Sequence, residues 1–196
     1  MLYCFTGRFL ICAGMGKRMA LLSRRDIIVA FERLGELAKA EGHTLRVVVL
    51  GGAAMVLGYN ARQATHDIDG FFLPPPDARL VREWIKTVAS ERGWPEDWLN
   101  DAAKGYLRGL SEGPVLLREP GIIVTQPATE QLLAMKLCAW RDDVDIADAS
   151  RLLKELASQA DRTAIWRRVL PYLLPGSELK AQLAFDDLWE SLHGTD

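Results

Sequence analysis

Hydrophobic residues recur along the first two thirds of the chain with two different periods. Over residues 23–42 they return every three or four positions, which predicts an amphipathic helix that Ser23 would cap. Residues 45–50 form a short Val-rich run typical of a buried strand, and a helix of small residues follows the Gly-Gly pair at 51–52. After a polar connection, residues 67–73 are predicted to form a second strand.

Helical periodicity dominates the rest of the chain. A helix is predicted at 77–91 and a helix-rich stretch at 95–110, and two strands at 115–117 and 122–125 are predicted to form a hairpin. Beyond these strands the pattern is helical to the end, with helices predicted at 127–140, 143–158, 161–173 and 176–192. A small mixed sheet flanked by helices, followed by a helical C-terminal third, belongs to the α+β class.

Three parts are predicted along the chain. Residues 1–22 form a poorly ordered or loosely attached N-terminal extension, 23–126 a core, and 127–196 a helical region that completes the active-site cleft. The first residues lack a basic start, and Arg8 interrupts their apolar stretch, so we do not interpret them as a signal peptide. They are also too few to span a bilayer, and no later segment reaches transmembrane length.

The composition is that of a globular protein whose charges nearly balance. Hydrophobic residues make up 49% and charged residues 26%, and the formal net charge is −2. A protein that binds nucleic acid over a wide face is usually basic, so any such contact here must be a local patch. The three cysteines lack Cys-x-x-Cys spacing, which argues against a disulfide framework or a zinc site and indicates a reducing compartment. We therefore expect a cytoplasmic protein with no membrane partner.

Two groups of basic residues are candidates for a nucleic-acid patch. Ordinary solvated helix faces are the alternative, since most exposed basic residues have no further role. Aromatic residues interleave with the first group and would either stack on an RNA end or, more commonly, pack in the core. The first group is Arg79, Arg82, Lys86, Arg92, Lys104 and Arg108, the second is Arg162, Arg167 and Arg168, and the aromatic residues are Trp84, Trp94, Trp98 and Tyr106.

The strongest chemical signal is a glycine pair followed by two acids. Gly51 and Gly52 come directly after a predicted strand, where glycine lets the backbone approach a phosphate closely. Asp67 and Asp69 are two apart on the next predicted strand, so their carboxylates would lie on one face. Two carboxylates side by side repel each other, and a divalent cation such as Mg²⁺ would relieve that repulsion. Solvated surface carboxylates are the alternative, because each motif alone is common.

A second group of charged residues lies in the helical C-terminal third. Lys136 falls within an apolar stripe, where a buried ammonium needs a partner. It would either extend to solvent or point into a cleft that binds phosphates. Asp145 and Asp148 are three apart on the next predicted helix and would flank the same cleft. Capping of that helix by Asp145 is the alternative.

The order strand, Gly-Gly, short helix, polar loop and strand with Asp-Ile-Asp resembles the signature of the DNA polymerase beta-like nucleotidyltransferase superfamily. The resemblance implies a nucleotidyltransferase fold and transfer of a nucleotidyl group from a nucleoside triphosphate to a hydroxyl. It implies that Gly51 and Gly52 approach the triphosphate, while Asp67 and Asp69 hold Mg²⁺ and are catalytic. Many members carry a third carboxylate on a later strand, and neither later predicted strand of this chain has one.

A narrower resemblance rests on the lysine in an apolar helix followed by Asp-x-x-Asp. This pattern is similar to the AbiEii/MenT group of bacterial nucleotidyltransferases, and residues 98–101 (WLND) resemble a motif in their smaller relatives. The resemblance implies that Lys136 contacts phosphate, that Asp145 and Asp148 form the helical acidic motif, and that Asp148 contributes to catalysis. It also implies that Thr65 lies at the substrate, where its phosphorylation would oppose the bound triphosphate.

The AbiEii/MenT group includes toxins, which points to an acceptor and a partner. In these relatives the acceptor is the 3′ end of tRNA, and nucleotides added there block aminoacylation and translation. The resemblance therefore implies tRNA as acceptor, a pyrimidine triphosphate (CTP) as donor, and a cognate antitoxin protein. Two alternatives remain at this point: a nucleotidyltransferase that modifies a protein or an antibiotic-like hydroxyl compound, and a nucleotide-binding module without catalytic activity.

Overall fold

The main sheet is mixed, as the sequence predicts. The computed structural model describes residues 21–74, 77–141 and 143–194, and the sheet within them has the strand order β5-β4-β2-β7-β6. The central strand β2 runs antiparallel to β4 and parallel to β7, while β5 is parallel to β4 and β6 antiparallel to β7. The strands are β2 (Leu45–Val49), β4 (Ile68–Phe72), β5 (Leu99–Asn100), β6 (Val115–Glu119) and β7 (Ile122–Thr125).

A second, two-stranded ribbon ties the start of the described chain to the polar loop before β4. In it β1 (Leu22–Ser23) pairs antiparallel with β3 (Ala64–Thr65), with Leu22 opposite Thr65. Most of the predicted N-terminal extension, residues 1–20, lies outside the described residues. Leu22, which the sequence analysis placed in that extension, is only 1% exposed and belongs to the hydrophobic core.

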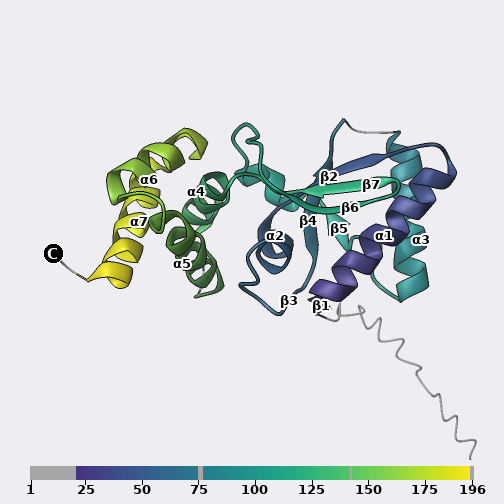
Figure 1. The fold of residues 1–196 in the computed structure, drawn as a ribbon, viewed down its shortest axis with the longest axis horizontal. Coiled ribbons are helices and arrows are strands. Elements are labelled where there is room, and N and C mark those ends of the chain that lie inside the picture. Colours follow the sequence, from purple (N-terminus) through teal and green to yellow (C-terminus); the bar gives the residue numbers. More distant parts are fainter. Residues whose placement is uncertain (1–20, 75–76, 142, 195–196) are drawn as a thin grey trace, which may run out of the picture.

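Three helices surround the strands and together with them form what we term the sheet lobe. They are α1 (Arg24–Ala40), α2 (Gly51–Leu57) and α3 (Ala78–Arg92). The side chain of Ser23 accepts a hydrogen bond from the backbone of Asp26 and the Asp26 carboxylate accepts one from the backbone of Ser23, so the predicted cap of α1 is confirmed. α1 packs along α3 and against β7 (Figure 1).

The prediction of a helix-rich stretch over 95–110 is wrong for most of its length. Its centre forms the short strand β5 and then a 3₁₀ helix, η1 (Ala102–Tyr106). Trp98 is fully buried, its indole N–H donates to the carbonyl of Ile85, and its own carbonyl accepts from the backbone N–H of Ile68 at 2.9 Å. These tertiary contacts hold the segment extended beside β4 and override its local helical preference.

The C-terminal part forms a bundle that we term the helical lobe. It comprises α4 (Thr129–Ala139), α5 (Asp143–Ala157), α6 (Arg162–Val169), η2 (Leu170–Tyr172) and α7 (Glu178–His193). In Figure 1 it lies at the opposite end of the molecule from α1 and α3, with α4 and α5 on the side nearer the sheet. The predicted helix at 161–173 is divided into α6 and η2, because Pro171 carries no backbone N–H to continue the α-helical pattern.

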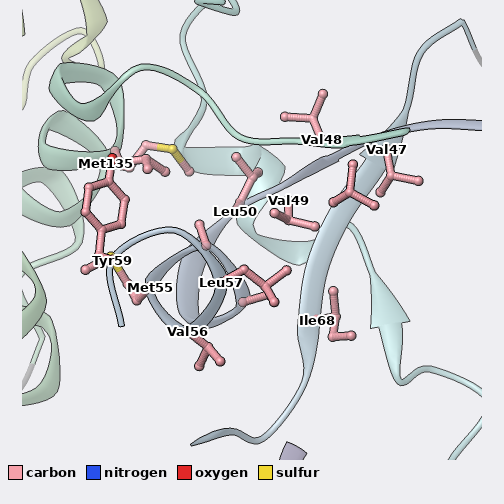
Figure 2. Close-up of a cluster of buried hydrophobic side chains, with 14 of the residues drawn as sticks. Val47, Val48, Val49, Leu50, Met55, Val56, Leu57, Tyr59, Ile68 and Met135 are labelled. Atoms are coloured by element: carbon pink, nitrogen blue, oxygen red, sulfur yellow. The ribbon is translucent and has the colours of Figure 1, made fainter. Parts of the chain in front are cut away.

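Buried apolar side chains run continuously from the sheet into the helical lobe. Figure 2 shows side chains of β2, α2 and β4 in one cluster, in which Tyr59, two residues after α2, lies next to Met55 of α2 and to Met135 of α4. Residues Gln131–Cys138 of α4 are buried without interruption, so this helix is covered on all sides rather than along one predicted stripe. Among the described residues, no helix is both long enough and apolar enough to cross a membrane.

Candidate functional site

The glycine turn lies directly against the second acid of the Asp-Ile-Asp motif. Because β2 and β4 are antiparallel, with Val49 opposite Gly70, the backbone N–H of Leu50 donates to the carbonyl of Asp69 at 2.8 Å. Gly51 follows with φ +51°, and a Cβ at this position would lie 2.8 Å from Oδ2 of Asp69. Both the backbone angle and the space therefore require glycine at residue 51.

The second glycine makes room for the polar loop. A Cβ on Gly52 would overlap the hydroxyl of Thr65 and lie 3.0 Å from the Cβ of Thr65. Thr65 itself is 5% exposed, and the β1–β3 ribbon holds its backbone. Thr65 thus belongs to the wall of the site.

Asp67 and Asp69 line the same pocket. Asp69 is the second residue of β4, whereas Asp67 immediately precedes the strand, which begins one residue later than the sequence predicts. Burial and the negative charge of Asp67 raise the pKa of Asp69, opposed by the backbone N–H of Ala103 and the positive charge of Lys136. Burial is the larger cause of this raised pKa, and the neighbouring carboxylate of Asp67 adds to it.

The segment from β5 into η1 contacts both acids. The side-chain amide of Asn100 donates to Oδ2 of Asp67 at 3.4 Å, and the backbone N–H of Ala103 donates to Oδ1 of Asp69 at 3.1 Å. The sequence analysis did not assign Asn100 to the site, although it lies within the WLND motif at 98–101. The segment from β5 into η1 thus donates hydrogen bonds to both Asp67 and Asp69, although it lies more than thirty residues after them in the chain.

Lys136 is held in a buried ion-pair cluster. Its ammonium lies 2.7 Å from Oδ1 of Asp145 and 2.7 Å from Oδ2 of Asp148, and both acids are 2% exposed. Of the two predicted alternatives for Lys136, extension to solvent is excluded, because its side chain is only 11% exposed. Lys136 and Asp145 line the pocket, whereas Asp148 lies behind them and is not among the residues of the pocket wall.

Two arginines that the sequence analysis did not select extend this cluster. Arg62, in the polar loop before β3, donates from Nε to Oδ1 of Asp148 at 2.8 Å and from a second nitrogen to Oδ2. Arg141, just before α5, donates to Asp145 from its side chain at 3.0 Å and from its backbone at 3.3 Å. Burial by itself would raise the pKa of Asp145. The hydrogen bonds from Arg141 and Lys136 outweigh burial, so the pKa of Asp145 lies below its ordinary value.

These groups surround one pocket of about 560 Å³ between the sheet lobe and the helical lobe. One wall consists of the glycine turn, the two acids and η1, and the other of α4 and the start of α5. Its polar part is lined by Gly51, Gly52, Arg62, Thr65, His66, Asp67, Asp69, Lys136, Arg141 and Asp145, and its more apolar part by Met55, Tyr106, Leu132, Met135, Val144 and Leu152. Asp67 and Asp69 of the sheet lobe therefore line the same cavity as Lys136 and Arg141 of the helical lobe.

The donor set suits a hard cation that shares its coordination with a substrate. Among the described residues, no three His, Cys, Asp or Glu side chains gather into a metal-binding group. The pair Asp67 and Asp69 thus provides two carboxylates and no more. Mg²⁺ is commonly bound by one or two carboxylates with water and substrate phosphate oxygens, so the residues present fit this cation.

Several residues of the predicted basic strips pair with groups of the protein itself. Lys86 pairs with Glu96 at 2.9 Å, and Arg108 donates to the carbonyl of Leu173 at 3.0 Å. In the second strip, two members form ion pairs with acidic partners of neighbouring helices: Arg162 with Asp186, and Arg168 with Glu130. The tryptophans pack as core residues, since Trp84 is 4% and Trp98 0% exposed. Tyr106 alone of the predicted aromatic group lines the pocket.

A second depression, of about 510 Å³, lies between α1 and α3 and lacks these features. Arg33 is its central residue and pairs with Glu36 at 2.9 Å and Glu91 at 2.8 Å. The pair of Arg33 with Glu91 joins α1 to α3, which indicates a structural role in their packing.

A glycine turn beside two acids, on a mixed sheet completed by a helical lobe, defines the nucleotidyltransferase class. The family model described as nucleotidyltransferase of unknown function (DUF6036) matches residues 25–160. This match covers more than half of the chain, and the chain belongs to that family. Searches of curated proteins and of solved structures gave no match. The predicted nucleotidyltransferase fold is confirmed, while the narrower AbiEii/MenT type stays a prediction.

Proposed function

We propose that this protein transfers a nucleotidyl group from a nucleoside triphosphate to an acceptor hydroxyl and releases pyrophosphate, with Mg²⁺ as cofactor. The observation that carries the proposal is the arrangement of the pocket. Asp67 and Asp69 lie on one wall beside the glycine turn, and Lys136 and Arg141 line the opposite wall. A polyanionic substrate that shares a cation with the acids and contacts the basic side chains would fill the space between them.

Each acid of the sheet lobe has a defined task in this reaction. Asp67 and Asp69 would hold Mg²⁺, which when bound supplies charge neutralisation for the phosphates and activation of the attacking hydroxyl. Gly51 and Gly52 leave space free of side chains next to these acids, so that the triphosphate can lie close to the backbone. η1 closes this side and keeps the Asp69 carboxylate in place through Ala103.

The cations of the helical wall bind and orient the phosphates. Lys136 pairs with Asp145 and Asp148, Arg62 with Asp148 and Arg141 with Asp145, so these cations converge beside the pocket. Lys136 and Arg141 line the cavity and would contact phosphate oxygens. Asp148 and Asp145 hold these cations in fixed positions, and we assign Asp148 a positioning role because it lies behind Lys136.

For the acceptor we propose the 3′ end of tRNA, with a pyrimidine triphosphate, CTP, as donor. This assignment rests on the similarity of the Lys136, Asp145 and Asp148 pattern to the AbiEii/MenT toxins. It carries the further proposals that the protein acts as a cytoplasmic toxin and that a cognate antitoxin neutralises it. Within the part of the chain that the structure describes, the exposed side chains of Arg79, Arg82 and Lys104 form no ion pair, and we propose them for contact with an RNA backbone.

The decisive test is transfer of label from each of the four radioactive nucleoside triphosphates to total tRNA in the presence of Mg²⁺. We expect labelled tRNA with the wild type, loss of labelling with Asp69→Asn, and normal labelling with Asp187→Asn, which changes an exposed carboxylate on α7. If the acceptor is a protein or a small molecule, the same assay in cell lysate would label that molecule instead of tRNA. This result would replace tRNA as the proposed acceptor. A folded wild-type protein that binds triphosphate by calorimetry but labels nothing would refute the enzymatic proposal and favour a binding module.

A further inference from the structure

We infer that Asn100 is a positioning residue that sets the orientation of both Asp67 and Asp69 from the neighbouring strand. The inference rests on the proposed function, because orientation matters only if the two acids hold a cation. It assigns a task to a residue outside the glycine, acid and lysine motifs.

Strand pairing brings Asn100 next to the acids. β5 runs parallel to β4 in a register that pairs Leu99 with Ile68 and Asn100 with Asp69. The backbone bond from Ile68 to Trp98, at 2.9 Å, and the full burial of Trp98 secure this register. A shift by one residue would move Asn100 to the other face, so the position of its side chain is set by the sheet itself.

The side chain of Asn100 uses both its acceptor and its donor. Its Oδ1 accepts the backbone N–H of Ala102 at 2.9 Å, which starts the 3₁₀ turn. Its Nδ2 donates to Oδ2 of Asp67 at 3.4 Å and to the carbonyl of Asp97 at 3.5 Å. An amide is one of the few side chains that can accept from a turn and donate to a carboxylate at the same time.

The turn that Asn100 starts carries the contact to the second acid. Ala103, directly after Ala102, donates its backbone N–H to Oδ1 of Asp69 at 3.1 Å. Asn100 therefore acts on Asp67 directly and on Asp69 through the backbone of η1. The other oxygen of Asp69, Oδ2, is directed towards the glycine turn, where the triphosphate is expected. Held in this way, the two carboxylates need no reorientation when a cation arrives.

The Asn100→Asp variant distinguishes a role of Asn100 as donor to Asp67 from two alternatives: a role in the turn alone, and a site that lacks a third carboxylate. Aspartate keeps an acceptor for Ala102 and so preserves the turn, but it replaces the donor to Asp67 with a negative oxygen. If Asn100 only starts the turn, the substitution will have no effect on cation binding. If the site instead lacks a third carboxylate, the substitution will tighten cation binding. Only a role as donor to Asp67 predicts weaker binding with an intact fold.

The measurement is binding of Mn²⁺, a spectroscopic substitute for Mg²⁺, followed by electron paramagnetic resonance of the free ion in the presence of a non-hydrolysable nucleoside triphosphate analogue. We expect the Asn100→Asp variant to bind the ion at least about tenfold more weakly than the wild type. Its urea unfolding midpoint should match that of the wild type. Asp101→Asn is the matched control, because Asp101 is the next residue in the same turn, is exposed, and is not part of the pocket wall.

The outcomes distinguish this inference from the proposed function. If the wild type binds no Mn²⁺ with the analogue, or if Asp69→Asn binds it as well as the wild type does, the proposed function itself fails and this inference with it. If the wild type binds the ion in an Asp69-dependent manner while Asn100→Asp binds it equally well or more tightly, only the positioning role of Asn100 is overturned. Weaker binding by Asn100→Asp with an unchanged fold supports it.

Discussion

Arg62 donates two hydrogen bonds to the carboxylate of Asp148, although 86 positions separate the two residues in the chain. The guanidinium lies in the loop that leads to Asp67, and the carboxylate lies on α5 of the helical lobe. This two-point ion pair joins the loop of one lobe to a helix of the other, next to the pocket. The wall that carries Asp67 and Asp69 is therefore joined to the helical lobe by a pair of which only Asp148 belongs to a motif recognised in the sequence.

Removing the charge of Asp148 should destabilise the protein strongly. Asp148→Asn would leave Arg62 without its carboxylate and Lys136 with only Asp145, in a region where Asp148 is 2% exposed. We expect the free energy of unfolding to fall by about 3 kcal/mol, as for other broken buried ion pairs. Urea unfolding followed by circular dichroism measures it. Asp143→Asn, at the exposed start of α5, should cost less than about 1 kcal/mol; equal losses in the two variants would contradict the role of the cluster.

Alanine at Gly51 should affect the site beyond its effect on stability. The backbone there has φ +51°, and the added Cβ would press on Oδ2 of Asp69. Gly42 offers a matched control, because it has φ +79° with nothing within 4 Å of an added Cβ. Both substitutions should cost about 1 kcal/mol of backbone strain, but only Gly51→Ala should reduce nucleotidyl transfer, by about tenfold or more. Equal transfer rates in the two variants would show that the turn does not border the reacting groups.

Arg141 offers a way to weaken triphosphate binding without loss of the fold. Its side chain is 65% exposed, yet it lines the pocket and contacts Asp145. We expect Arg141→Gln to raise the dissociation constant for a triphosphate analogue by about tenfold, the equivalent of one charge-assisted hydrogen bond. Isothermal titration calorimetry gives this constant directly. Lys154→Gln removes an exposed cation from α5 outside the pocket and should leave binding unchanged; a similar loss in both variants would indicate a general charge effect.

The contribution of Asp145 to stability should depend on pH. Because the folded state lowers the pKa of Asp145, its ionised form stabilises the protein fully above its ordinary value near 3.8, and this stability is lost as the pH falls through the lower folded-state value. Asp145→Asn should therefore be less stable than the wild type at pH 7, and the difference should shrink below pH 3.8. Unfolding curves of both proteins across this range test the sign. A difference that stays constant with pH would show that the carboxylate charge is not what stabilises the cluster.

Patterns within single segments of the sequence predicted much of this molecule. The periods of apolar residues located α1, α3 and the helices of the C-terminal lobe, the Val-rich run located β2, and the predicted hairpin located β6 and β7. The glycine pair and the Asp-Ile-Asp motif identified the residues of one pocket wall, because both signals depend on neighbours only a few positions apart. Lys136, in an apolar helix, already required a partner, and the two acids on the next helix supplied it.

Tertiary structure alone decided which distant groups complete the pocket. β5 is two residues long, and its extended form follows from the burial of Trp98 and its pairing with β4, so no local pattern distinguished it from a helix. Asn100 and Arg62 owe their positions to strand register and to the packing of the two lobes, which bring together residues tens of positions apart. The sequence by itself determined most of the elements and the first acids of the site. The packing of those elements determined how the acids are oriented and which cations face them, because these contacts depend on distances in space and not along the chain.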